Sequence, residues 1–353
     1  MALQESPRDQ RSGSATLQAA TMPTHHIIGL SGGKDSTATL LVALARLPKA
    51  QVQPVFVDTG NEQRQTYAYL DTLESHLDIP ITRLRPDFSE QMAAKRRFIA
   101  NDQRTGRDKR GVKLRWSNRR KREALAHLHP SGNPFLDLCL LKGMFPSNRT
   151  QFCTDYLKKQ TFIGYVDDLA QTGQRVVVWQ GIRREESDKR KNARLFERVG
   201  PGFYHFRPLI HWTTEDVFCF LAEKGVEPNP LYASLGRVGC APCLFANKKD
   251  LRAMLGAGEG FTPEDSADIL NRIRDWERRV SACSKTGRAA FFHGKELAGA
   301  HLHEVHPLTF WKRHSIDAVR HWSEKPTRFN AGDWGGFDAP EESSCSSEWG
   351  LCE

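Results

Sequence analysis

Short apolar runs alternate along the chain with longer segments whose apolar residues recur at helical spacing. The apolar runs lie at 25–30, 52–57, 79–84 and 175–179, and each has the length of a buried strand. The segments with helical spacing lie at 37–47, 62–77, 161–170 and 213–223. Strands that alternate with helices predict an α/β fold, in which right-handed crossovers place helices on both faces of a parallel sheet.

Three departures from this alternation divide the chain into parts. Residues 1–24 are rich in Gln, Ser, Thr and Ala, which predicts a disordered leader. The α/β domain is expected at 25–246, with a basic helical insertion at 95–125. We expect 247–353 to be helical to about residue 280 and irregular near its end, where it forms a cysteine-containing tail.

The positive charge of the chain is concentrated in one segment. The formal net charge is +9, which favours an anionic partner. From Lys95 to Arg122 there are thirteen Lys or Arg residues against only Asp102 and Asp108. Trp116 lies in the same run, and an aromatic ring beside arginines can stack on bases while the cations meet phosphates. The segment 95–122 predicts either a nucleic-acid contact or a solvated basic surface.

The apolar content and the cysteines bound the class of protein. No stretch reaches the roughly 18 to 20 apolar residues of a membrane helix, and the first residues do not have the apolar segment of a signal peptide. We therefore expect a cytoplasmic protein without a membrane partner. Eight cysteines in such a protein indicate reduced thiols or a metal site rather than a disulfide framework.

A glycine-rich loop, Ser31-Gly32-Gly33-Lys34-Asp35-Ser36, joins the first predicted strand to the first predicted helix. Backbone N–H groups at such a junction converge on phosphate oxygens, and glycines let the backbone approach closely. Lys34 can neutralise phosphate charge and the two serines can donate hydrogen bonds. Asp35 can hold Mg2+ or position the loop. The loop is not a Walker A sequence, because Lys-Asp-Ser follows the second glycine at once.

This loop resembles the pyrophosphate-binding loop, or PP-loop, of the adenine nucleotide α-hydrolase-like superfamily. Further blocks narrow the resemblance to the phosphoadenosine phosphosulfate (PAPS) reductase family. They are Val55-Phe56-Val57-Asp58-Thr59-Gly60 with Glu62, Cys153-Thr154 with Leu157-Lys158, Gly181-Ile182-Arg183 with Glu186-Ser187 and Arg190, Arg207-Pro208-Leu209, Trp212 with Asp216-Val217, and Asn229-Pro230-Leu231-Tyr232. They occur in the family's order over roughly two thirds of the chain.

The resemblance implies a Rossmann-like sheet that binds an adenine nucleotide at the loop of residues 31–36. Asp58, at the end of the second strand, would border the adenosine, and Gly181 would lie at the nucleotide site. Arg183 and Arg190 can make bidentate contacts to phosphate or sulfate. The alternative for these two arginines is surface ion pairing with the acidic residues between them.

Cys240 and Cys243 stand in a Cys-Ala-Pro-Cys sequence, which has metal-ligand spacing. The resemblance adds Cys153, because cluster-bearing members of the family have a Cys-Cys pair at that position. The candidates for the fourth ligand are Cys345, Cys352 and Cys139. A [4Fe-4S] cluster fits this set best, structural zinc comes next, and the absence of any metal is the remaining alternative.

The loop sequence favours ATP as the substrate. Reductases of the family use an already activated sulfonucleotide and carry a modified loop, whereas Gly-Gly-Lys-Asp-Ser resembles members that cleave ATP to AMP and pyrophosphate. We expect Lys34 and Asp35 to act on ATP with Mg2+, so that an acceptor is activated for sulfur insertion. Nucleic acid is a candidate acceptor, and a sulfur-donor protein such as a cysteine desulfurase is a candidate partner.

Two other functions are compatible with the sequence. The last residues, Glu348-Trp349-Gly350-Leu351-Cys352, resemble the mobile tail of the reductases that act on PAPS or on adenosine 5'-phosphosulfate (APS). Trp349, however, stands at the position of their nucleophilic cysteine. The second function is therefore a thioredoxin- or glutathione-dependent reductase that releases sulfite from PAPS or APS, with Cys352 or Cys345 as the nucleophile. The third is a nucleic-acid-binding component of a multiprotein system in which the nucleotide acts as a switch.

Overall fold

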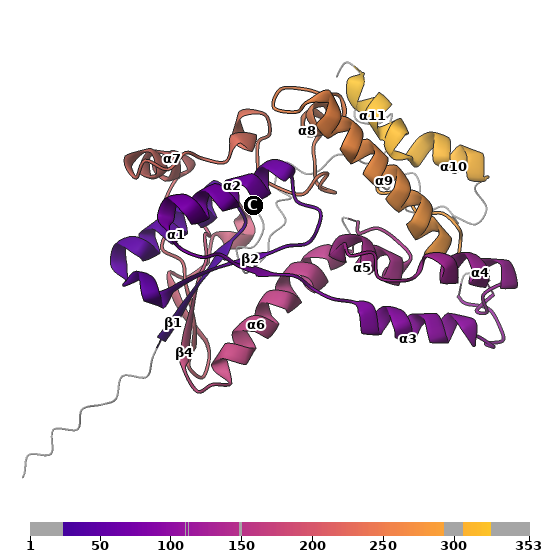
Figure 1. Cartoon of the computed structure of the whole chain (residues 1–353), viewed down its shortest axis with the longest axis horizontal. Helices are drawn as coiled ribbons and strands as arrows, with labels where there is room; N and C mark the ends of the chain where they lie inside the picture. Colours follow the sequence, from indigo (N-terminus) through magenta and orange to yellow (C-terminus); the bar gives the residue numbers. More distant parts are fainter. Residues whose placement is uncertain (1–23, 110, 112, 148–149, 293–305, 326–353) are drawn as a thin grey trace, which may run out of the picture.

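A mixed sheet forms the centre of the α/β part of the chain (Figure 1). The computed structural model describes residues 24–109, 111, 113–147, 150–292 and 306–325. Within them the sheet has the strand order β3-β2-β1-β4-β6-β5, and only the β5–β6 pair is antiparallel. The strands are β1 (Thr24–Leu30), β2 (Val52–Val57), β3 (Thr82–Leu84), β4 (Arg175–Trp179), β5 (Phe196–Gly200) and β6 (Phe203–Phe206).

The strands predicted at 25–30, 52–57 and 175–179 are confirmed within one residue. The strand predicted at 79–84 begins three residues late, at Thr82. Pro80 has no N–H to donate to a neighbouring strand, and the N–H of Ile81 donates instead to the Glu74 carboxylate at 2.8 Å. The apolar run there is buried as a loop before it becomes a strand.

Helices cover both faces of the sheet, as the sequence pattern predicts (Figure 1). α1 (Lys34–Arg46), α2 (Arg64–Leu77) and α7 (Thr214–Glu223) share an apolar core with Ile28 and Phe56, whereas α6 (Gln160–Ala170) packs on the other face against Ile27 and Val55. Neighbouring strand residues thus point to opposite cores, because side chains alternate along a strand. Thr213 caps the start of α7, because its side chain accepts the N–H of Asp216 at 3.1 Å.

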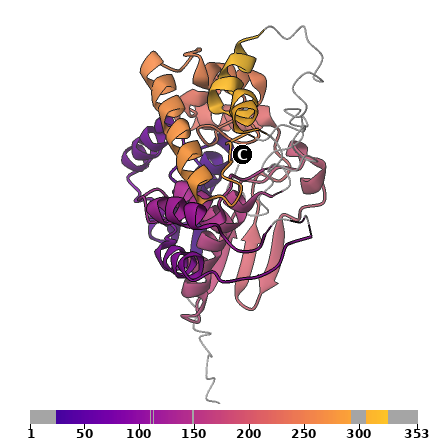
Figure 2. The ribbon, with the colours of Figure 1, turned by 90° about the vertical axis from the view of Figure 1, so that its right-hand side faces the viewer.

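A second layer of helices stands beside the sheet and has its own apolar core (Figures 1 and 2). Its long central helix, α9, contacts α4, α5, α8 and α11. The helices of this layer are α3 (Ser89–Ala100), α4 (Asn118–His127), α5 (Pro134–Lys142), α8 (Lys248–Leu255), α9 (Pro263–Cys283), α10 (Pro307–His314) and α11 (Ile316–Glu324). The basic segment and the C-terminal helices therefore share one core.

The predicted role of Trp116 in base stacking is wrong. Its side chain is only 7% exposed and belongs to the core of the helical layer. A buried indole contributes apolar area to folding and presents no face to a base.

In the described residues no helix has the length and apolarity needed to cross a bilayer.

A buried carboxylate on α9 ties the last helices to the layer. Glu277 accepts the N–H of Phe291 at 3.0 Å and the N–H of Ile316, at the start of α11, at 3.2 Å. Burial raises the pKa of Glu277 to about 8, from an ordinary 4.5. The folded chain therefore binds this proton more tightly than the unfolded chain does.

We expect the free energy of unfolding to fall as the pH rises from 4.5 to about 8, because only the folded state holds the Glu277 proton in that range. The contribution is on the order of 5 kcal/mol. Glu277→Gln should flatten this dependence, whereas Glu264→Gln, an exposed change on the same helix, should not. Urea unfolding at several pH values measures the slope, and equal slopes for wild type and Glu277→Gln would contradict the prediction.

Candidate functional site

The predicted phosphate loop connects β1 to α1 and is closed by its own hydroxyl groups. The N–H of Ser31 donates to Ser36 Oγ at 3.2 Å, and Ser36 Oγ donates to the carbonyl of Gly33 at 3.0 Å. Gly32 has a φ of +79°, and a Cβ there would lie 2.7 Å from Thr66 Cγ2. The turn therefore requires glycine at position 32.

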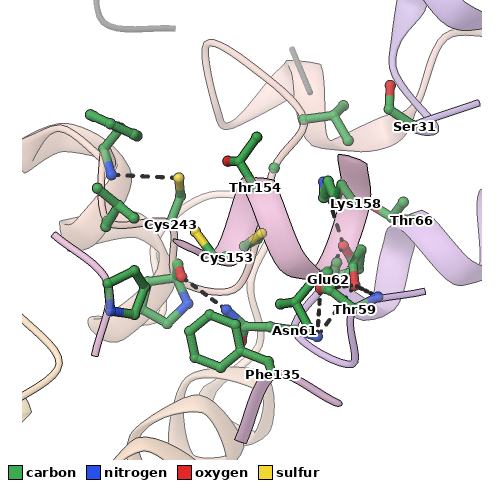
Figure 3. A pocket seen from close by; sticks show the side chains of 18 of the residues that line it. Ser31, Thr59, Asn61, Glu62, Thr66, Phe135, Cys153, Thr154, Lys158 and Cys243 are labelled. Atoms are coloured by element: carbon green, nitrogen blue, oxygen red, sulfur yellow. Dashed lines mark hydrogen bonds and ion pairs between the residues drawn. The ribbon is translucent and has the colours of Figure 1, made fainter. Parts of the chain in front are cut away.

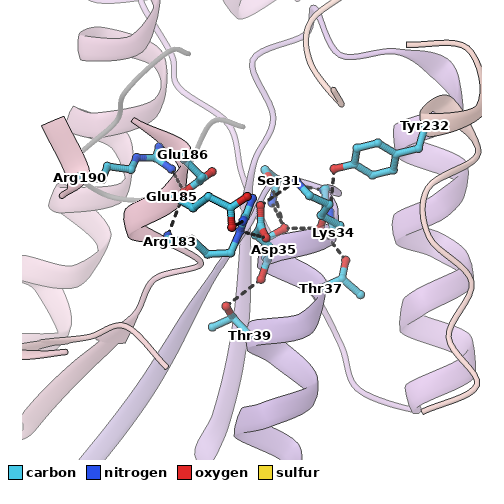
Figure 4. Close-up of polar contacts among 12 residues, drawn as sticks. Ser31, Lys34, Asp35, Thr37, Thr39, Arg183, Glu185, Glu186, Arg190 and Tyr232 are labelled. Atoms are coloured by element: carbon cyan, nitrogen blue, oxygen red, sulfur yellow. Dashed lines mark hydrogen bonds and ion pairs between the residues drawn. The ribbon is translucent and has the colours of Figure 1, made fainter. Parts of the chain in front are cut away.

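The first turn of α1 opens onto this loop. Gly33 is the N-cap residue and has no side chain to cap the helix, so N–H groups and the positive end of the helix dipole face the loop. Tyr232, on the short helix η5 (Pro230–Ala233), accepts the N–H of Lys34 at 3.0 Å (Figure 4). Asn229 donates to the carbonyl of Gly32 at 3.0 Å. A segment almost 200 residues further along the chain therefore holds the loop in place.

Gly181, predicted to lie at the nucleotide site, packs against the loop backbone. It follows the end of β4, and a Cβ at this position would lie 2.8 Å from the carbonyl carbon of Asp35. No side chain fits between the two backbones. The position after β4 thus sets how closely β4 approaches the start of α1.

Asp35 is fully buried and joins two cations (Figure 4). Its carboxylate accepts Arg183 Nε at 2.7 Å and Lys34 Nζ at 2.9 Å. Of the two roles predicted for Asp35, this geometry favours positioning the loop. Both cationic side chains are held at the N-terminus of α1, where an anion would bind.

Arg183 and Arg190 form ion pairs, but they are not at the surface. They are 3% and 6% exposed, and Glu186 accepts both the N–H of Arg183 and the guanidinium of Arg190. Arg183 Nη1 forms an ion pair with Glu185 Oε2 at 3.6 Å, but neither this nitrogen nor Arg190 Nη2 makes a hydrogen bond, although both are buried. A buried donor without an acceptor is costly, so each arginine retains one N–H group suited to a phosphate or sulfate oxygen.

Asp58, predicted to border the adenosine, lies at the end of β2 and turns toward α2. It accepts the hydroxyl of Tyr67 at 2.6 Å and the N–H of Gly60 at 2.8 Å, and Arg85 Nη1 lies 3.5 Å from it. Asp58 therefore orders the turn after β2. Its contact with adenosine stays a prediction.

A cavity next to the phosphate loop is lined by residues from several distant parts of the chain (Figure 3). Ser31 reaches it from the loop, Thr59 and Glu62 from the turn after β2, and Lys158 from the π-helical turn η2 (Cys153–Lys159). π-helical turns are frequent at functional sites. The cavity lies where the sheet meets the helical layer, since Phe291 of that layer also lines it.

Glu62 is the buried carboxylate of this cavity. It accepts the Thr59 hydroxyl at 2.8 and 2.9 Å, and Lys158 Nζ lies 3.7 Å from Glu62 Oε1. Burial raises the pKa of Glu62, while Lys158 and Thr59 oppose that shift. The Glu62–Lys158 pair therefore places one acidic and one basic side chain in the cavity beside the phosphate loop.

Three of the cysteines predicted as metal ligands line the same cavity: Cys153, Cys240 and Cys243. Figure 3 shows Cys153 and Cys243 facing the cavity from different segments. The sulfur of Cys243 accepts Arg237 Nη2 at 3.0 Å and the N–H of Phe245 at 3.5 Å. Hydrogen-bond donors of this kind stabilise negative charge on sulfur.

Backbone hydrogen bonds hold the Cys-Ala-Pro-Cys loop against the turn after β2. The N–H of Ala241 donates to the carbonyl of Asn61 at 2.7 Å, and Asn61 Nδ2 donates to the carbonyl of Pro242 at 3.2 Å. Cys240 also forms an isolated β-bridge with Glu62. The cysteine loop and the phosphate-loop side of the cavity are thereby fixed relative to each other.

The other cysteines differ in position. Cys139 is fully buried on α5, and burial, followed by the nearby Cys153, raises the pKa of its thiol well above the ordinary value. Cys219 is exposed on α7 and Cys283 is buried at the end of α9. Cys345 and Cys352 lie outside the described residues.

The two predicted metals, a [4Fe-4S] cluster and zinc, require different arrangements of these thiols. In the part of the chain that the structure describes, no three His, Cys, Asp or Glu side chains converge on one ion position. A single zinc ion needs its ligands within about 2.0–2.3 Å. A cluster gives each thiolate its own iron, and metal binding by these thiols stays a prediction.

Several residues of the site have no local sequence signal. Tyr232 and Glu62 belong to the blocks that carry the family resemblance, but their contacts with the loop and with Lys158 were not predicted. Arg237 was not singled out, because an arginine three residues before a cysteine motif is common on protein surfaces. These contacts join distant segments, so only the folded chain reveals them.

Known proteins resemble this chain to different extents. An uncharacterized 37.8 kDa protein of Escherichia phage 186 is 39% identical over 276 residues, which are 76% of this chain and 79% of that protein. The adenosine 5'-phosphosulfate reductase of Anoxybacillus flavithermus is 35% identical over 98 residues, which are 26% of this chain and 41% of that enzyme. The crystal structure of a PAPS reductase from Candida auris, in a phosphate complex, has 14% sequence identity and a TM-score of 0.38, and the match covers 63% of this chain and 83% of that one.

The family model for the phosphoadenosine phosphosulfate reductase domain matches residues 25–246. The matched range contains the phosphate loop, both buried arginines and the three cysteines of the cavity. The sheet, with helices on both faces, agrees with the Rossmann-like fold that the resemblance implies. This chain belongs to the phosphoadenosine phosphosulfate reductase family.

Proposed function

We propose that this protein cleaves ATP to AMP and pyrophosphate, and that the cleavage activates an acceptor for sulfur insertion. The observation that carries the proposal is the buried pairing of Asp35 with Lys34 and Arg183 at the open N-terminus of α1. Cleaving ATP between its α and β phosphates requires that the negative charge of the leaving pyrophosphate be stabilised. Two fixed cations and the helix N-terminus supply that stabilisation without rearrangement.

The proposed reaction has two steps. An oxygen of the acceptor attacks the α phosphorus of ATP, the bond to the bridging α–β oxygen breaks, and pyrophosphate leaves. Sulfur from a donor then attacks the carbon that carries the adenylated oxygen, the C–O bond breaks, and AMP leaves with that oxygen. A sulfur-donor protein such as a cysteine desulfurase would supply the sulfur.

Individual residues have distinct roles in this proposal. Lys34 and the buried N–H groups of Arg183 and Arg190 contact the phosphates. Asp35 is engaged by two cations, so we expect Mg2+ to enter on the phosphate oxygens of ATP, as it commonly does. Asp35 then acts as a positioning residue.

The cysteines that line the cavity are proposed to hold a [4Fe-4S] cluster. Cys153, Cys240 and Cys243 would be three ligands, and Cys345 or Cys352 would be the fourth. When bound, such a cluster would relay sulfur or electrons beside the nucleotide. Ser31 lines the same cavity, which is why the cluster is assigned to the active site and not to a remote structural role.

Reduction of a sulfonucleotide is the second candidate function. It is favoured by the similarity to adenosine 5'-phosphosulfate reductases, which covers about a quarter of this chain for the A. flavithermus enzyme. In this reaction a cysteine thiolate, Cys352 or Cys345, attacks the sulfur of PAPS or APS. The nucleotide leaves, and thioredoxin or glutathione then reduces the enzyme S-sulfonate and releases sulfite.

The two functions are separated by their products. We expect anaerobically purified protein to release pyrophosphate from ATP and no sulfite from APS or PAPS, because its loop carries the unmodified Gly-Gly-Lys-Asp-Ser sequence. Malachite green after pyrophosphatase and a colorimetric sulfite assay measure the products. Sulfite from APS or PAPS, with no pyrophosphate from ATP, would replace the proposal by the reductase. Binding of ATP without either product would favour a nucleotide switch.

Lys34→Ala should lower the rate of pyrophosphate release by roughly 100-fold or more, because a charge that meets the leaving group is lost. The fold should persist, since Asp35 keeps its bond to Arg183. Arg183→Lys should lower the rate as well, because lysine cannot reproduce the two directions of a guanidinium.

Arg184→Lys is the matched control, since Arg184 is the exposed neighbour of Arg183. Its rate should equal that of wild type, and the melting temperature of every variant is measured beside its rate. An unchanged rate in folded Lys34→Ala protein would contradict the assigned role of the loop.

The cluster predicts iron and acid-labile sulfide in a ratio near one in anaerobically purified protein, with about four irons per chain. Cys240→Ser and Cys243→Ser should each lose most of the iron and the visible absorption near 400 nm that thiolate-bound iron produces. Cys219→Ser, which changes an exposed cysteine on α7, should keep both. Stoichiometric zinc in place of iron would reject the cluster.

A further inference from the structure

A strongly basic surface lies on the helical layer, away from the phosphate loop. We call it the basic face and define it by the exposed cations of α3, of the 101–117 loop and of α4, together with Lys285 after α9. Its members are Arg97, Arg104, Arg107, Lys109, Lys113, Arg115, Arg119, Arg122 and Lys285. Figure 1 shows α3 and α4 at the end of the molecule opposite α1.

The described part of the loop between α3 and α4 is organised by one buried carboxylate. Asp102 accepts the N–H of Trp116 at 2.8 Å and Arg104 Nε at 2.8 Å. These donors hold the pKa of Asp102 well below its usual range. Trp116 anchors the end of the loop in the core, and Lys285 Nζ donates to the carbonyl of Lys113 at 2.9 Å. The loop is thus tied to the layer at several points.

The cations of this segment divide into two groups. Arg96 and Lys121 point inward, where Arg96 donates to the carbonyl of Leu128 at 2.9 Å and Lys121 donates to that of Asp102 at 2.9 Å. Lys95 and Arg120 also donate to backbone carbonyls of the layer, those of Leu141 and Ser284. The cations of the basic face are exposed. Among the described residues, no carboxylate forms an ion pair with Arg97, Lys109, Lys113, Arg115 or Arg122.

Exposed cations without acidic partners repel one another and are costly to keep together unless an anion neutralises them. The arrangement is typical of a surface that meets a chain of phosphates.

One aromatic ring stands on the basic face. Phe98 on α3 is 48% exposed, and the guanidinium carbon of Arg104 lies 4.7 Å from the centre of its ring. An exposed ring beside a guanidinium plane offers stacking surfaces to an unpaired base. A duplex keeps its bases stacked inside and cannot use this pair, so the ring favours a single strand.

A short segment connects the basic face to the cavity of the candidate site. It begins after α9 with Lys285, runs past Arg288, and reaches Phe291, which lines the cavity and stacks on Phe135 at 5.8 Å. Arg120 of α4 holds this segment by donating to the carbonyl of Ser284. The face and the cavity are therefore parts of one packed unit.

We propose that the basic face binds single-stranded nucleic acid, with the backbone on its exposed cations and one base stacked on Phe98. The further statement that this strand is the acceptor for sulfur rests on the proposed function. The binding itself does not, because it uses residues outside the phosphate loop and the cysteine cavity.

The test is fluorescence anisotropy of full-length protein with a fluorescein-labelled 20-nucleotide single strand, as DNA and as RNA, and with the matching duplex, at several salt concentrations. Wild type should bind the single strand more tightly than the duplex. Phe98→Ala should weaken single-strand binding roughly 5- to 100-fold. The triple change Arg97→Gln, Arg115→Gln and Arg122→Gln should reduce the slope of log affinity against log salt by about 2.

The charge-matched control changes Arg46, Lys49 and Arg175 to Gln. These three exposed cations lie near the N-terminal ends of the strands, at the opposite end of the sheet from the phosphate loop. The affinity of this control should equal that of wild type. Equal losses in the control and in the basic-face triple variant would overturn the proposal, as would single-strand binding that Phe98→Ala leaves unchanged.

Pyrophosphate release from ATP is measured on the same preparations without nucleic acid. Pyrophosphate formation without single-strand binding would overturn this inference and leave the proposed function standing. Single-strand binding that depends on Phe98, without pyrophosphate formation, would support the basic face and reject the proposed chemistry.

Discussion

The structure of the site depends on one buried carboxylate, Asp35. A fully buried charge is tolerated only when it is paired and hydrogen-bonded, and here Lys34 and Arg183 supply both. The pairing joins the start of α1 to the segment after β4, at a place where Gly181 already brings the two backbones into contact. Lys34 at the start of α1 and Arg183 after β4, which are distant in sequence, thereby lie beside one possible ligand position.

The strands β5 and β6, which form an antiparallel pair, were not among the predicted strands. The alternation of apolar runs and helical segments was enough to predict β1, β2, β4 and part of β3, and the glycine-rich junction was enough to predict the phosphate loop. Both depend on interactions between residues close in sequence. The inward turn of Trp116 could not be predicted, because its burial depends on packing in a layer that also includes α9. The pairing of Arg237 with Cys243 was missed for a similar reason, since the local pattern does not say which way an arginine points.

The second layer of helices gives the molecule a surface away from the sheet and the phosphate loop. Residues that lie on either side of position 246 pack into one core, so the basic segment is supported by α9 rather than standing alone. The cavity lies where this layer meets the sheet, and it draws side chains from both. The proposed nucleotide chemistry and the proposed nucleic-acid binding therefore fall in different layers of one packed molecule.

The backbone hydrogen bond from the N–H of Ala241 to the carbonyl of Asn61 has a consequence for how this family can diversify. It joins the main chain of the cysteine loop to the main chain of the turn after β2, so the spacing between them depends on few of the cavity's side chains, chiefly that of Asn61 itself. Substitutions that line the cavity can therefore change the chemistry while the spacing is preserved. An insertion or deletion in the turn after β2 cannot preserve this spacing. It would move the turn and the cysteine loop together, and so change the distance between the thiols and the phosphate loop.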